Sequence, residues 1–100
     1  MSYRLEIRDV AIADIEEAAD WYNAQRTGLG SEFVQAVRQA IRALPQHPLI
    51  HPLRERRRNV RSLRLLRFPY RVFYRIRGDS IIVFAVLYKG RHDRLWKERL

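Results

Sequence analysis

Residues 70–88 read YRVFYRIRGDSIIVFAVLY, and this stretch decides the fold class. β-branched and aromatic residues dominate both of its halves, which is typical of strands. Gly78 and Asp79 separate the halves, and a Gly-Asp break between two such runs predicts a β-hairpin. Because the run 80–88 is apolar on both faces, we expect it to lie inside a sheet rather than at its edge.

The first strand of this predicted hairpin has two different faces. By the two-residue period, one face carries Tyr70, Val72, Tyr74 and Ile76, and the other carries Arg71, Phe73, Arg75 and Arg77. We expect the first set to face the core. Since a lone exposed Phe is unusual on a monomer, we expect a bound partner or the C-terminal tail to cover Phe73.

The segments around the hairpin are predicted with less regular patterns. A further strand is expected over residues 60–67. Residues 46–58 hold prolines, histidines and charges without a period, which predicts a loop with a basic end. Residues 89–100 form a polar tail, which we expect Leu95 and Trp96 to anchor to the fold.

Two amphipathic helices are predicted in the N-terminal half. The first covers residues 10–26, with an apolar stripe of Ile12, Ile15, Ala19 and Tyr22. The second is capped by Ser31 and ends at Pro45, with a stripe of Phe33, Val37, Ala40, Ile41 and Leu44. Only a few residues join the helices, which predicts an antiparallel hairpin. Trp21, Tyr22, Tyr70 and Tyr74 are interpreted as packing aromatics.

A short strand is predicted before the helices, because Tyr3, Leu5 and Ile7 alternate with charged residues. The resulting order β-α-α-β-β-β predicts an α+β fold in a single domain, residues 1–100, with the helical hairpin on one face of a mainly antiparallel four-stranded sheet. The opposite face is then expected to be partly bare. It would present Arg71, Arg75 and Arg77, with Arg64 as a neighbour.

Positive charge is concentrated in the C-terminal half. Residues 1–50 hold five Arg and seven acidic residues, whereas residues 51–100 hold fifteen Arg or Lys and four acidic residues. The net charges are −2 and +11, which add to the +9 of the whole chain. This asymmetry favours an anionic partner such as nucleic acid, a ribosome or an acidic protein segment, although a basic surface can also serve solubility alone.

The sequence predicts that the protein has no metal site, no cofactor site and no membrane-spanning segment. The chain has no cysteine, and His47, His51 and His92 lack ligand spacing, so we expect no metal and no cofactor. No apolar run approaches the length of a spanning helix, and the first residues are charged where a signal peptide is apolar. We therefore expect a cytoplasmic protein without a membrane partner.

Several segments occur in an order and spacing that are specific only when taken together. They are Asp14–Ala18 leading to Trp21 and Tyr22, Gly28–Gly30 followed by Phe33, His51 and Pro52, Arg67–Arg75, and Ile81–Leu87 followed by Arg91 and Trp96. In these segments, over almost its whole length, the chain resembles the RelE/ParE superfamily of toxins. The resemblance implies a RelE/ParE-like fold and a type II toxin that an antitoxin holds inactive by wrapping it with an extended or helical tail.

The resemblance implies one of two activities. RelE-like members cut messenger RNA on the ribosome, where positive side chains hold the pentavalent phosphate and another group moves the proton. ParE-like members poison DNA gyrase and need no nuclease site. By position, Arg71 and Arg91 match arginines of the RelE-like pattern, and Arg64 stands where a lysine often occurs.

Two positions depart from the nuclease pattern. The C-terminal tyrosine of nuclease members falls near Trp96, whose indole N–H is a donor only, and Ser62 stands where a second lysine is expected. Tyr88, His92 and Asp93 are the candidate substitutes for acid–base work. The departures weaken the nuclease interpretation, and the segment 68–70 is more similar to the ParE-like branch.

We therefore expect a growth-inhibiting toxin that acts on DNA gyrase and is neutralised by the acidic segment of a cognate antitoxin. The alternatives are a metal-independent, RelE-like endoribonuclease acting on ribosome-bound messages and a non-toxic basic module that binds nucleic acid, so enzymatic activity stays open. The predicted target-binding or antitoxin-binding residues are Arg71, Phe73, Arg75, Arg77, Tyr88, Lys89 and Arg91. The residues predicted to be catalytic in the RelE-like case are Arg64, Arg71, Arg91 and His92, and the basic loop comprises Arg54, Arg56, Arg57 and Arg58.

Overall fold

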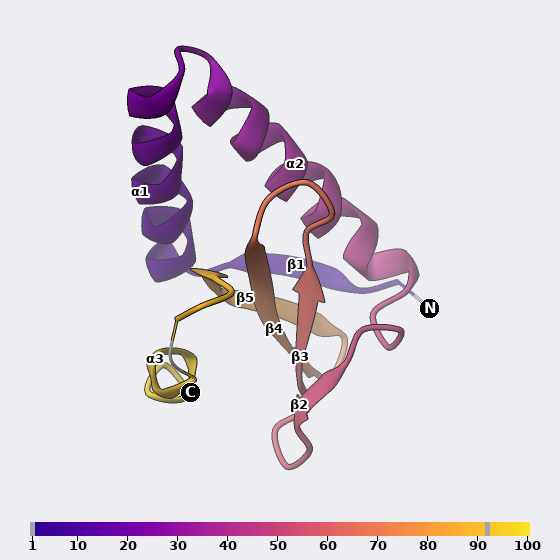
Figure 1. Ribbon diagram of the computed structural model, residues 1–100. Helices are drawn as coiled ribbons and strands as arrows, with labels where there is room; N and C mark the ends of the chain where they lie inside the picture. Colours follow the sequence, from indigo (N-terminus) through magenta and orange to yellow (C-terminus); the bar gives the residue numbers. More distant parts are fainter. Residues whose placement is uncertain (1, 92) are drawn as a thin grey trace.

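A computed structural model describes residues 2–91 and 93–100 (Figure 1). The elements are β1 (Arg4–Ile7), α1 (Asp9–Gln25), α2 (Leu29–Ala43), the 3-10 helix η1 (Leu44–Gln46), β2 (Leu53–Glu55), β3 (Val60–Arg64), β4 (Tyr70–Arg77), β5 (Ser80–Tyr88) and α3 (Arg94–Lys97). The α+β class and both hairpins are as the sequence predicts. None of the described helices is long and apolar enough to cross a membrane.

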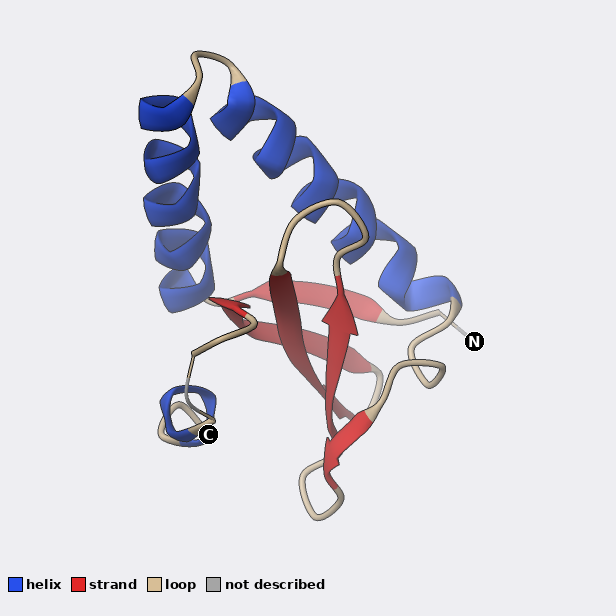
Figure 2. Cartoon of the chain, in the orientation of Figure 1, coloured by secondary structure: helices blue, strands red, loops and turns tan. Residues whose placement is uncertain are grey.

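The strands form one five-stranded sheet in the order β1-β5-β4-β3-β2. Only the β1–β5 pair is parallel; the other three pairs are antiparallel. β5 lies between β1 and β4, which confirms that its apolar run belongs to the interior of the sheet. The two long helices form a hairpin over one face of this sheet (Figure 2).

The expected number of four strands is wrong, because β2 lies within the segment predicted to be a loop. It is only three residues long and its register with β3 shifts between Leu53 and Glu55, so no two-residue period is visible in the sequence. A tight turn then leads into β3. The Glu55 carboxylate accepts the Arg58 backbone N–H at 2.9 Å, and Asn59 adopts a φ of 54°.

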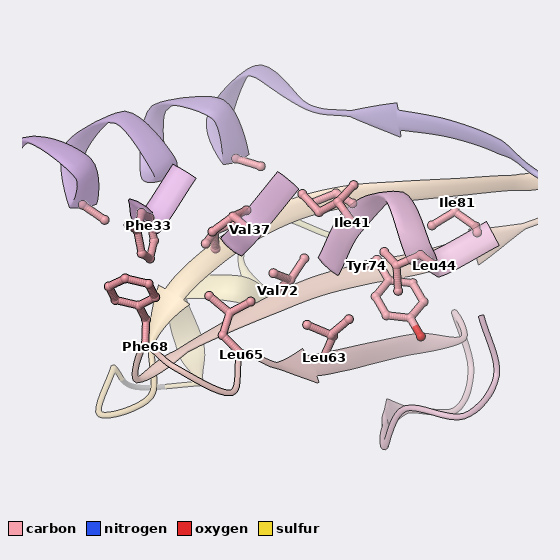
Figure 3. Close-up of a cluster of buried hydrophobic side chains, with 14 of the residues drawn as sticks. Phe33, Val37, Ile41, Leu44, Leu63, Leu65, Phe68, Val72, Tyr74 and Ile81 are labelled. Atoms are coloured by element: carbon pink, nitrogen blue, oxygen red, sulfur yellow. The ribbon is translucent and has the colours of Figure 1, made fainter. Parts of the chain in front are cut away.

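The main core lies between the helical hairpin and the inner face of the sheet (Figure 3). The predicted stripe of α2 is confirmed, since Phe33, Val37, Ile41 and Leu44 are buried and Ala40 packs against them. The sheet contributes Leu63, Val72, Tyr74, Ile81, Val83 and Val86. Each large apolar side chain buried in this way stabilises the fold by about 1.5–3 kcal/mol relative to exposure.

The junction of α1 and α2 differs from the expected capping by Ser31. The helix begins at Leu29, after Gly28 with a φ of 90°, so Ser31 lies inside the first turn and makes no capping bond. Gly30 instead donates its backbone N–H to the Asn23 side chain at 2.8 Å. A Cβ at Gly30 would lie 2.3 Å from the Ala19 carbonyl oxygen, so the close approach of the helices requires glycine.

Three expectations for the N-terminal elements are wrong. Leu5 and Ile7 are 38% and 37% exposed, because β1 lies at the sheet edge rather than under a helix. Ile12 is 42% exposed, since Ala11 and Ala18 face the core and shift the buried stripe of α1.

A β-bulge changes the alternation of β5. Two successive residues of β4 pair with Ala85 and Val83, which leaves Phe84 as the extra residue. Phe84 and Ala85 therefore both belong to the outer face of the sheet, whereas Val83 and Val86 face the helices. The bulge thus places two adjacent residues of β5 in a second, smaller hydrophobic cluster. This second cluster comprises Val60, Phe73, Phe84, Ala85, Leu87 and Trp96.

Candidate functional site

The second cluster covers the middle of the outer sheet face. Trp96 of α3 is 1% exposed and packs over Phe73, which is itself 4% exposed. Of the two expected covers of Phe73, a bound partner or the C-terminal tail, the structure has the tail, and the expectation of a partly bare outer face is wrong for the middle of the sheet. Phe73 is therefore unavailable to a partner while α3 is in place.

Arg54 of the edge strand β2 contacts this cover on the same face of the sheet. Its guanidinium contacts Asp93 at 3.3 Å, donates to Ser62 Oγ at 3.3 Å, and lies 5.6 Å from the centroid of the Phe73 ring. Arg54 was predicted as part of a basic loop, but it lies on β2 and is half-buried. Of that predicted set, Arg56–Arg58 form the exposed turn between β2 and β3.

A second ion pair, between Asp14 and Arg99, joins the tail to α1. Arg99 donates to the two carboxylate oxygens of Asp14 at 2.6 and 3.1 Å and to the Phe84 carbonyl oxygen at 3.2 Å. Asp14 in turn accepts the backbone N–H of Val86 at 2.9 Å. These side chains therefore satisfy the backbone of β5 beyond Val83, where its pairing with β1 ends.

Predicted cationic residues converge at one end of the sheet. Arg64 and Arg71 are directly opposite on β3 and β4, and Arg71 donates to the Lys89 carbonyl oxygen at 3.3 Å. Together with Arg67 they line a depression of about 210 Å³, which we call the cationic pocket. Its other lining residues are Leu65, Leu66, Phe68, Pro69 and Tyr70.

The remaining predicted residues lie elsewhere. Arg75 and Arg77 lie toward the other end of β4, and Arg75 is opposite Val60, so the buried Phe73 separates them from Arg71. Arg91 lines a different groove, between α1, the end of β5 and the tail. His92 was predicted as a catalytic candidate and lies outside the described residues.

A larger groove of about 830 Å³ runs between α1, the end of β5 and the tail. It is lined by the 58%-exposed Trp21 and the 47%-exposed Tyr88, with Glu17 and Arg91 among the charged residues. Trp21 was interpreted as a core or packing aromatic; it packs edge-on against Tyr22, with 5.1 Å between the ring centroids, but it is mostly exposed and is not part of the core. Its position within the acidic face of α1 was the available signal, since a Trp among Glu and Asp is not part of the helix stripe.

The protonation of the cationic pocket favours anion binding. Burial raises the pKa of Tyr70, so its hydroxyl stays protonated at neutral pH and is a poor base. The contact of Glu32 with Arg67 lowers the pKa of that carboxyl and keeps it ionised. Three arginines and a lysine around a small depression can bind phosphate or carboxylate groups.

Within residues 2–91 and 93–100, no group of three or more His, Asp or Glu side chains is arranged to hold a metal ion. Arg64, Arg71 and Lys89 of the cationic pocket were predicted from the sequence. Arg67 was missed, because it was placed within a strand rather than in the turn that follows β3.

A family model described as the ParE toxin of the type II toxin–antitoxin system parDE matches residues 5–93. The chain belongs to the ParE toxin family. The matched range includes the cationic pocket and ends before α3. No curated protein sequence matches the chain significantly.

Solved structures similar to this ParE family member have the same fold. A chain of the chromosomal ParDE toxin–antitoxin system from P. aeruginosa superposes with a TM-score of 0.76 at 22% identity, covering 85% of this chain and 94% of that one. A mutant of the E. coli toxin RelE in the free state gives 0.68 at 15% identity, covering 99% and 95%. A chain of the M. tuberculosis RelBE2 complex gives 0.58 at 20% identity, covering 91% and 95%.

Proposed function

We propose that this ParE family toxin inhibits growth by binding DNA gyrase, and that an acidic segment of a cognate antitoxin neutralises it by covering the cationic pocket. The observation that carries the proposal is the composition of that pocket. Arg64, Arg71 and Lys89 lie together there. Among the described lining residues, Tyr70 is the only titratable one whose side chain is not a cation. Such a pocket binds anions but has a poor base.

The environment of Trp96 supports gyrase over messenger RNA. Nuclease members of the superfamily, as the resemblance implies, use a tyrosine near this position. Here the indole is buried in the second cluster, and its Nε1 has no hydrogen-bond partner among the described residues. A side chain in this environment packs against the sheet and takes no part in proton transfer.

A RelE-like nuclease is the second candidate, favoured by the direct opposition of Arg64 and Arg71 across β3 and β4. Two cations so placed are suited to stabilise a pentavalent phosphate. The proton carrier would be Tyr88 or Asp93, which are both exposed, or His92. Asp93 already forms an ion pair with Arg54, and His92 lies outside the described residues, which leaves Tyr88 as the described candidate without an ion-pair role.

The same cationic pocket supports neutralisation of the toxin by an acidic antitoxin. An extended acidic segment would place carboxylates against Arg64, Arg67 and Arg71, where charge-assisted hydrogen bonds are strongest. The similar folds from P. aeruginosa and M. tuberculosis belong to a chromosomal ParDE toxin–antitoxin system and to the RelBE2 toxin–antitoxin complex. The neighbouring reading frame is therefore expected to encode a small acidic protein.

The deciding experiment is inducible expression of the chain alone in bacteria. We expect growth arrest accompanied by a DNA-damage response and gyrase cleavage complexes, with messages left intact at early times. Immediate loss of translation with cut messages would instead support the nuclease. Absence of arrest, with the folded protein present, would contradict both toxin functions.

Arg71→Ala combined with Arg91→Ala separates the activities further. The matched control is Arg38→Ala with Arg42→Ala, which removes the same charge from exposed positions of α2. Message cutting that is lost in the first pair and kept in the control would support the nuclease. Under the gyrase proposal neither wild type nor control cuts messages, and the first pair weakens gyrase poisoning relative to the control.

A further inference from the structure

The strand β1 lies at the edge of the sheet, and no described residue pairs with the outer side of its backbone. Arg4 donates its backbone N–H to Asp79 at 2.8 Å, and Arg8 donates to Val83 at 2.9 Å, so the even-numbered residues face β5. Because backbone groups alternate along a strand, Tyr3, Leu5 and Ile7 direct their N–H and C=O groups away from the sheet. Such an edge is a template for another strand.

The side chains of β1 are also unprotected. All four residues of the strand are exposed, including the apolar Leu5 and Ile7. Two further exposed apolar residues, Val10 and Ile12, follow at the start of α1. Natural sheets protect an edge with a bulge, a proline, a covering segment, a short strand or charged side chains; among the described residues, β1 has only the last two, its length of four residues and the charges of Arg4 and Glu6.

We propose that β1 pairs in antiparallel orientation with β1 of a second copy of this chain, about a two-fold axis at Leu5. In this register Leu5 faces the second copy's Leu5 and Tyr3 faces its Ile7. Every outward-facing backbone group of the strand is then used, in six hydrogen bonds between the copies. Aromatic and β-branched residues opposite one another are a favourable cross-strand pair.

Charge complementarity favours a second copy of β1 as the pairing strand, and it favours the register with the two-fold axis at Leu5. About the Leu5 axis, Arg4 of each copy lies opposite Glu6 of the other. An axis at Glu6 would oppose the two glutamates and set Arg4 against Arg8, which is unfavourable. An axis at Ile7 would set Leu5 against Asp9, where the chain has already entered α1. The strand is therefore complementary to itself in one register.

The ion pairs that these side chains make within one copy are weak competitors. Arg4 lies 3.6 Å from Asp79, with side chains 80% and 59% exposed. Glu6 lies 3.0 Å from Arg8, with side chains 52% and 56% exposed. Exposed pairs of this kind contribute little, so exchanging them for pairs between copies costs little.

The dimer extends two five-stranded sheets into one continuous sheet and leaves the cationic pocket free. β1 and β3 lie at separate positions of the strand order, with β5 and β4 between them. Each dimer therefore presents two cationic pockets on its far sides. The inference concerns the assembly of the chain and does not depend on which target it binds.

Leu5→Pro tests the backbone part of the proposal. The outward N–H of Leu5 is removed, while the groups that bond to β5 belong to its neighbours, and proline is tolerated at such edge positions. Light scattering on the purified chain is expected to give twice the 12.0 kDa of one chain for wild type and 12.0 kDa for the variant. Circular dichroism checks that both are folded.

A charge exchange between Arg4 and Glu6 tests the register. It also tests the dimer independently if Leu5→Pro does not fold. Glu6→Arg alone is expected to give monomers, because it opposes two arginines. Adding Arg4→Glu to Glu6→Arg is expected to restore the dimer, and Arg38→Glu on α2 is the control that leaves it intact. A wild-type chain of monomer mass at every concentration overturns the proposal, as does a Glu6→Arg variant that stays dimeric.

Discussion

The Trp96 ring stacks on Phe73 at 19° from parallel, with 5.2 Å between the ring centroids. This contact joins the C-terminal helix α3 to the outer face of the sheet. The indole Nε1 is buried with no hydrogen-bond partner among the described residues, so the contact is made by stacking and apolar burial alone. The unsatisfied donor itself opposes burial.

Replacing Trp96 separates these two contributions. Trp96→Ala is expected to lower the free energy of unfolding by about 3–5 kcal/mol, as for other buried aromatic residues. Trp96→Phe keeps a stacking ring and removes the unsatisfied donor, so we expect less than half of that loss. Urea denaturation measures both. Equal losses for the two variants would show that ring stacking is not what holds α3.

The Asp14–Arg99 ion pair is expected to be energetically coupled. The two side chains are 13% and 18% exposed, so removing either one leaves a mostly buried charge or backbone group without its partner. Asp14→Ala or Arg99→Ala should each cost about 1–3 kcal/mol of stability. The double variant should lose clearly less than the sum. Additive losses in this cycle would mean that the two residues act independently.

Binding of an acidic antitoxin segment is expected to depend on Arg64 and Arg71. Replacing either by Gln should weaken the affinity by about tenfold or more, because a charge-assisted hydrogen bond contributes about 1.5–3 kcal/mol. Titration calorimetry at two salt concentrations measures the effect, and salt should weaken the wild type more than the double variant. Arg38→Gln on α2 is the control. Unchanged affinity in the double variant would remove the cationic pocket from the antitoxin interface.

Tyr74 is expected to make stability fall at alkaline pH. Burial raises its pKa from 10.0 to about 12, and its hydroxyl donates to the Pro48 carbonyl oxygen at 2.5 Å. The unfolded chain loses this proton near pH 10 while the folded chain keeps it, so unfolding becomes easier as pH rises toward 12. The loss is about 2–3 kcal/mol over this range. Denaturation of Tyr74→Phe should show a shallower alkaline decline, and an identical decline would refute the assignment.

Gly30 is expected to tolerate no side chain. Gly30→Ala would bring a Cβ within 2.3 Å of the Ala19 carbonyl oxygen, so the helices must separate, at about 1–3 kcal/mol. Ser31→Ala is the control, since Ser31 makes no capping bond and should change stability by less than about 0.5 kcal/mol. Thermal unfolding compares the two. A costly Ser31→Ala would restore Ser31 as a structural residue.

The two strands of the β4–β5 hairpin and the helix α2, which has a complete apolar stripe, were predictable from the sequence. β4 and β5 have the predicted bounds, because two long β-rich runs flank a two-residue turn. β2 was not predictable. It is held by its pairing with β3 and by the Glu55–Arg58 turn, and three residues with a register shift leave no pattern to detect.

The candidate site was predictable in its residue types more than in its arrangement. Alternation placed Arg71 and Phe73 on the outer face, and β3–β4 pairing brought Arg64 beside Arg71. The tail was one of two expected covers of Phe73, but the stacking of Trp96 on Phe73 and the Arg54–Asp93 ion pair beside it depend on contacts between distant segments. No local pattern encodes such contacts, so Arg54 was expected in a basic loop.

The C-terminal tail covers the centre of the outer sheet face, so the exposed cations lie around the edge of that face. Arg56–Arg58 precede β3 and Arg64 ends it, so the length of this strand, roughly 13–16 Å at 3.3 Å per residue, separates two positive regions. A single acidic side chain would reach one region at a time. A partner that engages both must present acidic groups at least this far apart, and shortening the acidic stretch that joins them by a few residues would convert a two-point attachment into a weaker single one.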